Sequence, residues 1–192
     1  TWDNTDDILS KDEFERKCIV TIDGDTYIDI DSGVHKGVVV GGHYYEDFIH
    51  DALPDNPGQV PVHPRQGTEP DSLTITGTTH VNLTGGVYRN MVLGATYYDG
   101  WDNVEMYTGG VIINVDGCTM GNADMNGTSN AYNYAVVGGY YIDECLHGDE
   151  VEGPYGSSNP HAVTISATVG DINLTFADTT VNGIILGGSH IL

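Results

Sequence analysis

The sequence has very little positive charge. Only six Lys and Arg residues stand against 28 Asp and Glu, which gives a formal net charge of -22 over 192 residues. A surface this acidic repels phosphates, so nucleic acid is excluded as a partner. Long apolar runs are missing as well, and no stretch approaches the roughly 20 residues that would cross a bilayer. The sequence therefore predicts neither nucleic-acid binding nor a membrane span.

Cysteine is scarce, with three residues, Cys18, Cys118 and Cys145. They are too few for a disulfide framework and lack the CxxC spacing of zinc sites. One bridge between Cys118 and Cys145 is one interpretation, and three reduced, buried thiols is the other. The GxSxG, P-loop and HExxH motifs are absent too, so no common catalytic signature indicates an enzyme.

What the chain does contain is an internal repeat. The segment CIVTIDGDTYIDIDSGVHKGVVVGGHYY aligns without a gap on DSLTITGTTHVNLTGGVYRNMVLGATYY, so that Thr21 matches Thr74 (74 − 21 = 53). The closing element of the repeat recurs at 135–139 and 184–188, which gives four copies. So many matches at one offset indicate a true repeat protein.

Each copy contains three short strand patterns. A VTI strand is followed by a strand of alternating polarity, such as residues 27–31, and then by an apolar VVVGG strand. No helical periodicity separates the copies, so the fold class is all-β. A repeat unit that cannot bury its own apolar face can bury it by stacking on the neighbouring units, which predicts a parallel β-helix, or solenoid. An antiparallel β-sandwich or jelly roll is the alternative.

The expected organisation is a cap followed by one solenoid domain. Residues 1–17 form the cap segment, in which Ser10 and Glu13 have capping-box spacing for a short helix. Residues 18–192 form the solenoid, with copies at about 18–71, 72–109, 110–161 and 162–192. The last copy is apolar and has no polar cap, which predicts either that the sequence is a fragment of a longer solenoid or that copies of the chain associate end to end. The residues expected to make that contact are Ile184, Ile185, Leu186, Ile191 and Leu192.

The acidic residues suggest calcium as a cofactor, because Asp supplies the oxygen ligands that this ion prefers. No EF-hand or nonapeptide pattern is present. The expected ligands are Asp23, Asp25, Asp29 and Asp31, with Asp99 and Asp102 as another set. One loop also offers nitrogen and oxygen ligands for a transition metal, without any known spacing, at His43, Glu46, Asp47, His50 and Asp51.

Three long loops follow the same repeat position and are expected to emerge on one side, at about 46–71, 99–109 and 143–161. Aromatic side chains near these loops can stack on sugar rings or anchor an interface. The predicted binding residues are Tyr45, Tyr98, Trp101 and Tyr140, and packing beneath the loops is the alternative, favoured for the first Tyr of each pair.

Two further features concern the outer surface. Asn82, Asn126 and Asn173 lie in glycosylation sequons, and the first and third are expected at one repeat position, facing outward. Lys36 and Arg89 are also equivalent, with Asn133 and Asn182 expected in the other two copies. Such a cation pair suits the carboxylate of an acidic sugar, or it relieves local repulsion between acids.

The GGVY, VVVGG, VVGG and ILGG elements, separated by VTI and INLT strands, resemble the pectin-lyase-like parallel β-helix repeats of bacterial surface adhesins and other secreted fibre proteins. The resemblance covers about residues 18–192. It implies extracellular or cell-surface placement and a role in attachment or assembly, and it transfers no catalytic residue. We therefore expect a non-enzymatic, self-assembling fibre subunit, with surface glycans as a further partner. A carbohydrate-binding or polysaccharide-cleaving β-helix is the alternative.

Overall fold

The computed structural model describes residues 18–46, 70–99, 103–121, 133–143 and 164–191. These residues form four successive coils, called coils 1 to 4 below, with coil 3 spanning both 103–121 and 133–143. All regular structure in these ranges is β-strand, and none of it is helix. The capping helix expected within residues 1–17 lies outside the described residues. The described part of the chain likewise contains no helix long and apolar enough to cross a membrane.

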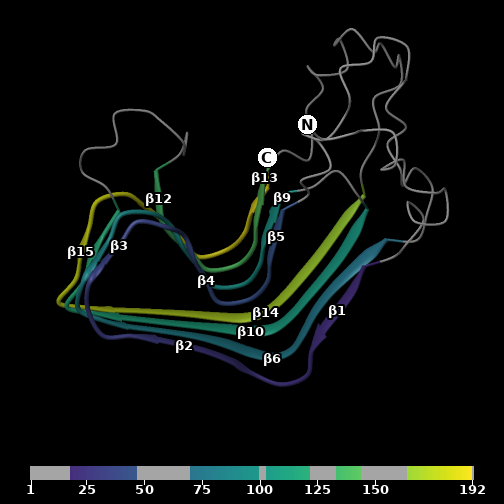
Figure 1. Cartoon of the computed structure of the whole chain (residues 1–192), viewed down its shortest axis with the longest axis horizontal. Helices are drawn as coiled ribbons and strands as arrows, with labels where there is room; N and C mark the ends of the chain where they lie inside the picture. The colour runs from purple at the N-terminus through teal and green to yellow at the C-terminus, as the bar shows by residue number, and fades with distance from the viewer. Residues whose placement is uncertain (1–17, 47–69, 100–102, 122–132, 144–163, 192) are drawn as a thin grey trace, which may run out of the picture.

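Each coil contributes to four parallel sheets, and Figure 1 shows the outline of the coils with equivalent strands lying one behind another. The long sheet contains β1 (Ile19–Ile22), β2 (Thr26–Ile30), β6 (Asp71–Thr84), β10 (Val104–Asp116) and β14 (Ile165–Ala177). The second sheet contains β3 (Val34–His35), β7 (Val87–Tyr88), β11 (Thr119–Met120) and β15 (Thr180–Val181). The third contains β4 (Val39–Val40), β8 (Val92–Leu93), β12 (Tyr134–Val137) and β16 (Ile184–Leu186). The fourth contains β5 (Tyr44–Glu46), β9 (Tyr97–Asp99), β13 (Tyr141–Asp143) and β17 (His190–Ile191).

Every described pair of strands joins equivalent strands of neighbouring coils in parallel. This confirms an all-β, solenoid-like stack of parallel strands, whereas the sandwich alternative requires antiparallel neighbours. The offset of 53 is also the true register, because Thr21 pairs with Thr74 and Tyr44 with Tyr97. The prediction of three strands per copy was wrong in two respects: the VTI and alternating segments belong to one sheet and form a single strand in coils 2 to 4, and the second and fourth sheets were not predicted.

The copy boundaries differ in the third coil. The prediction began this copy at residue 110 and left 99–109 as a loop, but β10 already starts at Val104, opposite Asp71. Residues 111–115 are the counterpart of the alternating strand in this coil, since Val111 pairs with Thr79. Glu46, Asp99 and Asp143 share one register position, so the three connections that follow them begin at a common corner of the stack, although the second one, 100–103, is short.

The repeated glycines are explained by close contact between coils. A methyl group on Gly41 would collide with the carbonyl oxygen of Gly94, and one on Gly94 would collide with that of Gly138. A second column, formed by Gly24, Gly77, Gly109 and Gly170, lies where the long sheet bends between β1 and β2 (Figure 1). Backbones pack against each other at both positions, so side chains are excluded from them.

The interior is filled by apolar ladders that run through the stack. Ile28, Val81, Ile113 and Leu174 share one column of the long sheet. Val81 and Ile113, in coils 2 and 3, are fully buried, whereas Ile28 and Leu174 in the end coils are half-buried. The core is therefore complete in the middle of the stack and open toward both ends.

Candidate interface at the two end coils

The two ends of the stack expose apolar side chains and strand edges. In each of the four sheets, the strand of coil 1 lies at one edge and the strand of coil 4 lies at the other. At the first end, Ile19 and Tyr27 are each 64% exposed, and Val34 and Tyr44 are also exposed. Within the described residues, these edge strands have a pairing partner on one side only. An edge of this kind is a template for pairing with a further strand.

The predicted assembly residues lie at the other end. Ile184, Ile185 and Ile191 are exposed, with Ile191 at 60%, and Leu186 is half-buried. Leu192 lies outside the described residues. The structure therefore brings four of the five predicted residues together on strands β16 and β17 of coil 4.

An aromatic column connects the two ends along the fourth sheet. Tyr44 stacks on Tyr97 with ring centroids 4.9 Å apart, and Tyr97 stacks on Tyr141 at 5.6 Å. His190 continues the column 5.0 Å from Tyr141, and its Nδ1 lies 3.0 Å from the Tyr134 hydroxyl. One ring from each coil thus forms a continuous stack that ends in Tyr44 at one end and His190 at the other.

The aromatic residues predicted to bind a ligand are instead largely part of the interior. Tyr98 is fully buried, and Tyr45 is half-buried and directs its hydroxyl toward the Asp71 carboxylate at 3.3 Å. Tyr140 donates to the Thr168 carbonyl at 2.7 Å, and burial raises its pKa to about 12. Trp101 lies outside the described residues.

The reason for this difference is strand alternation. In the pairs at 44–45 and 97–98 the second tyrosine points inward and is the more buried of the two, whereas packing had been favoured for the first. The third pair is out of step, because Tyr141 pairs with Tyr97 and Tyr140 therefore falls one position earlier. Equal sequence spacing did not reveal this shift.

The four aspartates predicted as calcium ligands form hydrogen bonds between coils 1 and 2. Each accepts from the residue 53 positions later: Asp23 from Thr76 Oγ1 (2.9 Å), Asp25 from the Thr78 amide (2.7 Å), Asp29 from Asn82 Nδ2 (2.7 Å) and Asp31 from Thr84 Oγ1 (3.1 Å). Throughout the described ranges, no group of three or more His, Cys, Asp or Glu side chains could hold a metal ion. Calcium stays a prediction without support from this geometry.

Of the alternative metal ligands, His43 and Asp99 are described. Both ring nitrogens of His43 are buried and lack a hydrogen-bond partner, and burial lowers the pKa of this histidine. The side chain of Glu46 and the whole of Asp47, His50, Asp51 and Asp102 lie outside the described residues. Transition-metal binding at this loop therefore also stays a prediction.

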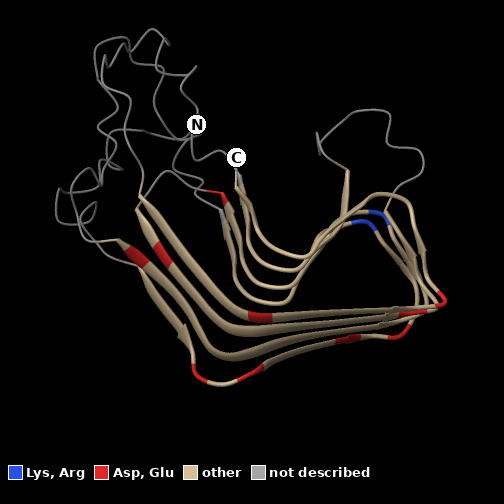
Figure 2. Cartoon of the chain, turned by 180° about the vertical axis from the view of Figure 1, so that it is seen from behind, with Lys and Arg blue, Asp and Glu red and all other residues tan. Residues whose placement is uncertain are grey.

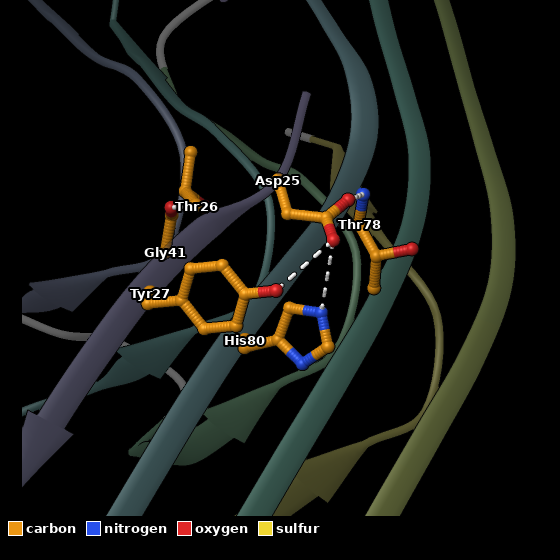
Figure 3. Close-up of polar contacts among 6 residues, drawn as sticks. All are labelled: Asp25, Thr26, Tyr27, Gly41, Thr78 and His80. Carbon is orange, nitrogen blue, oxygen red and sulfur yellow. Dashed lines mark hydrogen bonds and ion pairs between the residues drawn. The ribbon is translucent and has the colours of Figure 1, made fainter.

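Asp25 is the centre of a polar cluster on the outer face of the long sheet (Figure 3). Its Oδ2 accepts from the Tyr27 hydroxyl at 3.1 Å, and His80 Nε2 lies 3.8 Å away. The rings of Tyr27 and His80 are stacked with centroids 4.5 Å apart. Hydrogen bonding from the Thr78 amide, and then from Tyr27, lowers the pKa of Asp25 below its ordinary value. The cluster therefore attaches coil 1 to coil 2 through a charged acceptor.

This arrangement predicts an acid-sensitive contact. Because the folded state lowers the pKa of Asp25, its carboxylate adds stability above about pH 4, and this stability is lost as the pH falls through the folded-state pKa. Between pH 5 and pH 3, the hydrogen-exchange protection factor of the Thr78 amide should fall in the wild type and stay nearly constant at a lower level in Asp25→Asn. Asp178→Asn, at an exposed aspartate of coil 4, is the control and should behave as the wild type. The same pH dependence in Asp25→Asn and the wild type would contradict the assignment.

The sequon residues differ in their surroundings. Asn82 belongs to a polar ladder in which its amide donates to Asp29 and its oxygen accepts from Asn114 Nδ2 at 2.9 Å. Asn173 is exposed but does not share the position of Asn82, because Asn82 pairs with Asn114 and Asn114 pairs with Thr175. The expected equivalence was therefore wrong by two residues. Asn126 lies outside the described residues, and glycosylation stays a prediction.

Lys36 and Arg89 lie side by side, as the two blue segments in Figure 2 show. They are the only Lys or Arg residues within the described ranges, both are exposed, and neither forms an ion pair with a described carboxylate. Asn182 follows in the same column of coil 4, but coil 3 places Gly121 there and not Asn133. The error arises because the connection between β11 and β12 is longer than the connection between β7 and β8, which displaces Asn133 from this column.

Cys18 and Cys118 are free thiols, so the bridge from Cys118 to Cys145 is not formed. Burial raises the pKa of the Cys118 thiol, in keeping with a small apolar side chain in the core. Cys145 lies outside the described residues. Comparison of the chain with protein-family models, with curated proteins and with solved structures gave no match in any of the three.

Proposed function

We propose that this chain is a structural subunit that assembles end to end into a fibre through coils 1 and 4. The observation that carries the proposal is the pair of end coils, where the four sheets of the described residues finish in edge strands with exposed apolar side chains. Contact between two such ends would bury these side chains and pair the free backbone groups. Because the two ends differ, the contact is head to tail, which generates a filament when it does not close into a ring.

Closure of the coils into a β-helix, placement outside the cell or on its surface, and an adhesin-like role belong to the same proposal. They are supported by the resemblance to secreted repeat proteins and by the high acidic charge, which suits a soluble subunit. Calcium is included as a support for assembly on the strength of the acidic composition alone.

Electron microscopy of the purified chain tests the proposal. We expect unbranched filaments with an axial repeat of about 19 Å per subunit, because four coils of ~4.8 Å each stack along the axis. Loss of the filaments on addition of a calcium chelator would add calcium to the mechanism. Monodisperse monomers at all protein concentrations would contradict self-assembly.

Carbohydrate binding is the second candidate function. It is supported by the neighbouring cations Lys36 and Arg89, which could hold the carboxylate of an acidic sugar on an otherwise acidic molecule. In that case, isothermal titration with an oligosaccharide of uronic acids should give saturable binding that Lys36→Ala with Arg89→Ala abolishes. Polysaccharide cleavage would require catalytic side chains beyond this pair.

A further inference from the structure

We infer that the joint between two copies continues the register found inside the chain, with coil 4 of one copy pairing with coil 1 of the next as coil 1 pairs with coil 2. This inference rests on the proposed self-assembly and specifies its interface. In this register Gly187 lies against Gly41 of the next copy, His190 against Tyr44, and Ile185 against Val39. Three columns of the stack support it.

The first is the glycine column of the third sheet. A methyl group on Gly41, Gly94 or Gly138 would in each case meet the carbonyl oxygen of the glycine in the following coil. Gly187 continues the column in coil 4, where an added methyl group would meet no atom within 4 Å. Within the described residues, therefore, no contact requires glycine at position 187. The backbone of a further coil would require it, and coil 1 of a second copy presents Gly41 at this position.

The second is the aromatic column. Neighbouring rings in the stack from Tyr44 to His190 are 4.9 to 5.6 Å apart, with interplanar angles of 8° to 26°. Placing His190 on Tyr44 of the next copy would extend the stack with the same spacing, and it would cover a tyrosine that is 56% exposed.

The third is the set of interior ladders. Leu174 and Phe176 of coil 4 occupy the columns of Ile28 and Ile30 in coil 1, and all four are half-buried. On the outer face, Thr175 shares a column with Asp29, which already accepts a hydrogen bond from Asn82 through Oδ1. The Thr175 hydroxyl would supply a donor to the other carboxylate oxygen. Large apolar groups and a donor thus face matching positions across the joint.

One column destabilises the joint through repulsion between carboxylates. Asp171 occupies the column of Asp25, so two carboxylates would approach each other, and each copy carries a net charge of -22. Salt screens such repulsion over a distance that falls from about 30 Å at 0.01 M to about 8 Å at 0.15 M. Assembly in this register should therefore strengthen with ionic strength.

The glycine column provides a variant that separates folding from assembly. Gly187→Ala should fold and melt as the wild type, but it should raise the critical concentration for assembly roughly 10-fold to 100-fold, the effect of overpacking at the joint. Gly37→Ala is the matched control, because a methyl group there also meets no atom within 4 Å and the same column holds Asn90 in coil 2, so this position accommodates a side chain. It should assemble as the wild type. Equal critical concentrations for the two variants would overturn the inferred register.

Cross-linking tests the register directly, in a background of Cys18→Ser, Cys118→Ala and Cys145→Ser. Copies with Ile185→Cys are mixed with copies with Val39→Cys, whose Cα atoms should approach to disulfide range, about 4.4 to 6.8 Å. Val34→Cys, in another sheet, replaces Val39→Cys as the off-register control. We expect a covalent dimer with Val39→Cys only. Filaments that give no such dimer would overturn the register while leaving self-assembly intact, whereas the absence of wild-type filaments would overturn both.

Discussion

Replacement of Gly94 by alanine should lower the free energy of unfolding by about 3 kcal/mol, the upper part of the usual range for overpacking a well-packed interior. The added methyl group would collide with the carbonyl oxygen of Gly138 and with Cγ1 of Val111. Gly94 and both of these neighbours are buried. The backbone of coil 3 cannot move away without breaking the bond from the Gly94 amide to the Val137 carbonyl, which is 2.9 Å long.

Urea denaturation of the monomer, at a protein concentration below that of assembly, measures this effect. Gly37→Ala is again the control and should change the free energy of unfolding by less than about 0.5 kcal/mol, as surface substitutions usually do. The contrast between the two glycines depends only on contact with the next coil. If Gly94→Ala were as stable as Gly37→Ala, the close backbone contact between coils 2 and 3 would be disproved.

The offset of 53 was predictable because coils 1 and 2 contain no insertion between Cys18 and Tyr45. Repeated side chains then fix the register, since a slip by one residue would turn every apolar side chain outward. The aspartate contacts could have been found by the same means. Offset 53 places Thr76 and Asn82 opposite Asp23 and Asp29. A hydrogen-bond donor opposite each carboxylate indicates a contact between coils more directly than it indicates a calcium site.

The register of coils 3 and 4 could not be predicted to the residue. The irregularity between Thr108 and Gly110 shifts the pairing of β6 with β10 by one position, and the short repeat carries no signal for it. Asn82 and Asn173 appeared equivalent because each precedes a Leu-Thr pair, whereas the pairing of β10 with both of its neighbours aligns Asn82 with Thr175. Packing was favoured for the first tyrosine of each pair, and Tyr140 is the only one of these three that is fully buried; its inward direction depends on the register of β13 and not on the YY pair itself.

Truncation of Ile113 to alanine should have the other large effect, a loss of about 4 kcal/mol in the free energy of unfolding. Ile113 is fully buried, and its register neighbours Val81 and Leu174 cover it from both adjacent coils. Ile28→Ala changes the same column at the end of the stack, where Val81 covers the side chain from one coil only. We expect the loss there to be about 2 kcal/mol, because the site is already partly solvated and leaves a smaller cavity.

The difference between these two variants also depends on assembly. In a solenoid each coil is stabilised mainly by its immediate neighbours, so the end coils of a single chain should open before the middle ones. A second copy would cover Ile28 with its own Leu174, and Ile28→Ala should then cost nearly as much in the filament as Ile113→Ala. Hydrogen exchange checks this, since coil 1 amides should gain protection on assembly while coil 2 amides, already enclosed, change little. Equal protection of coil 1 in monomers and filaments would mean that copies join at another surface.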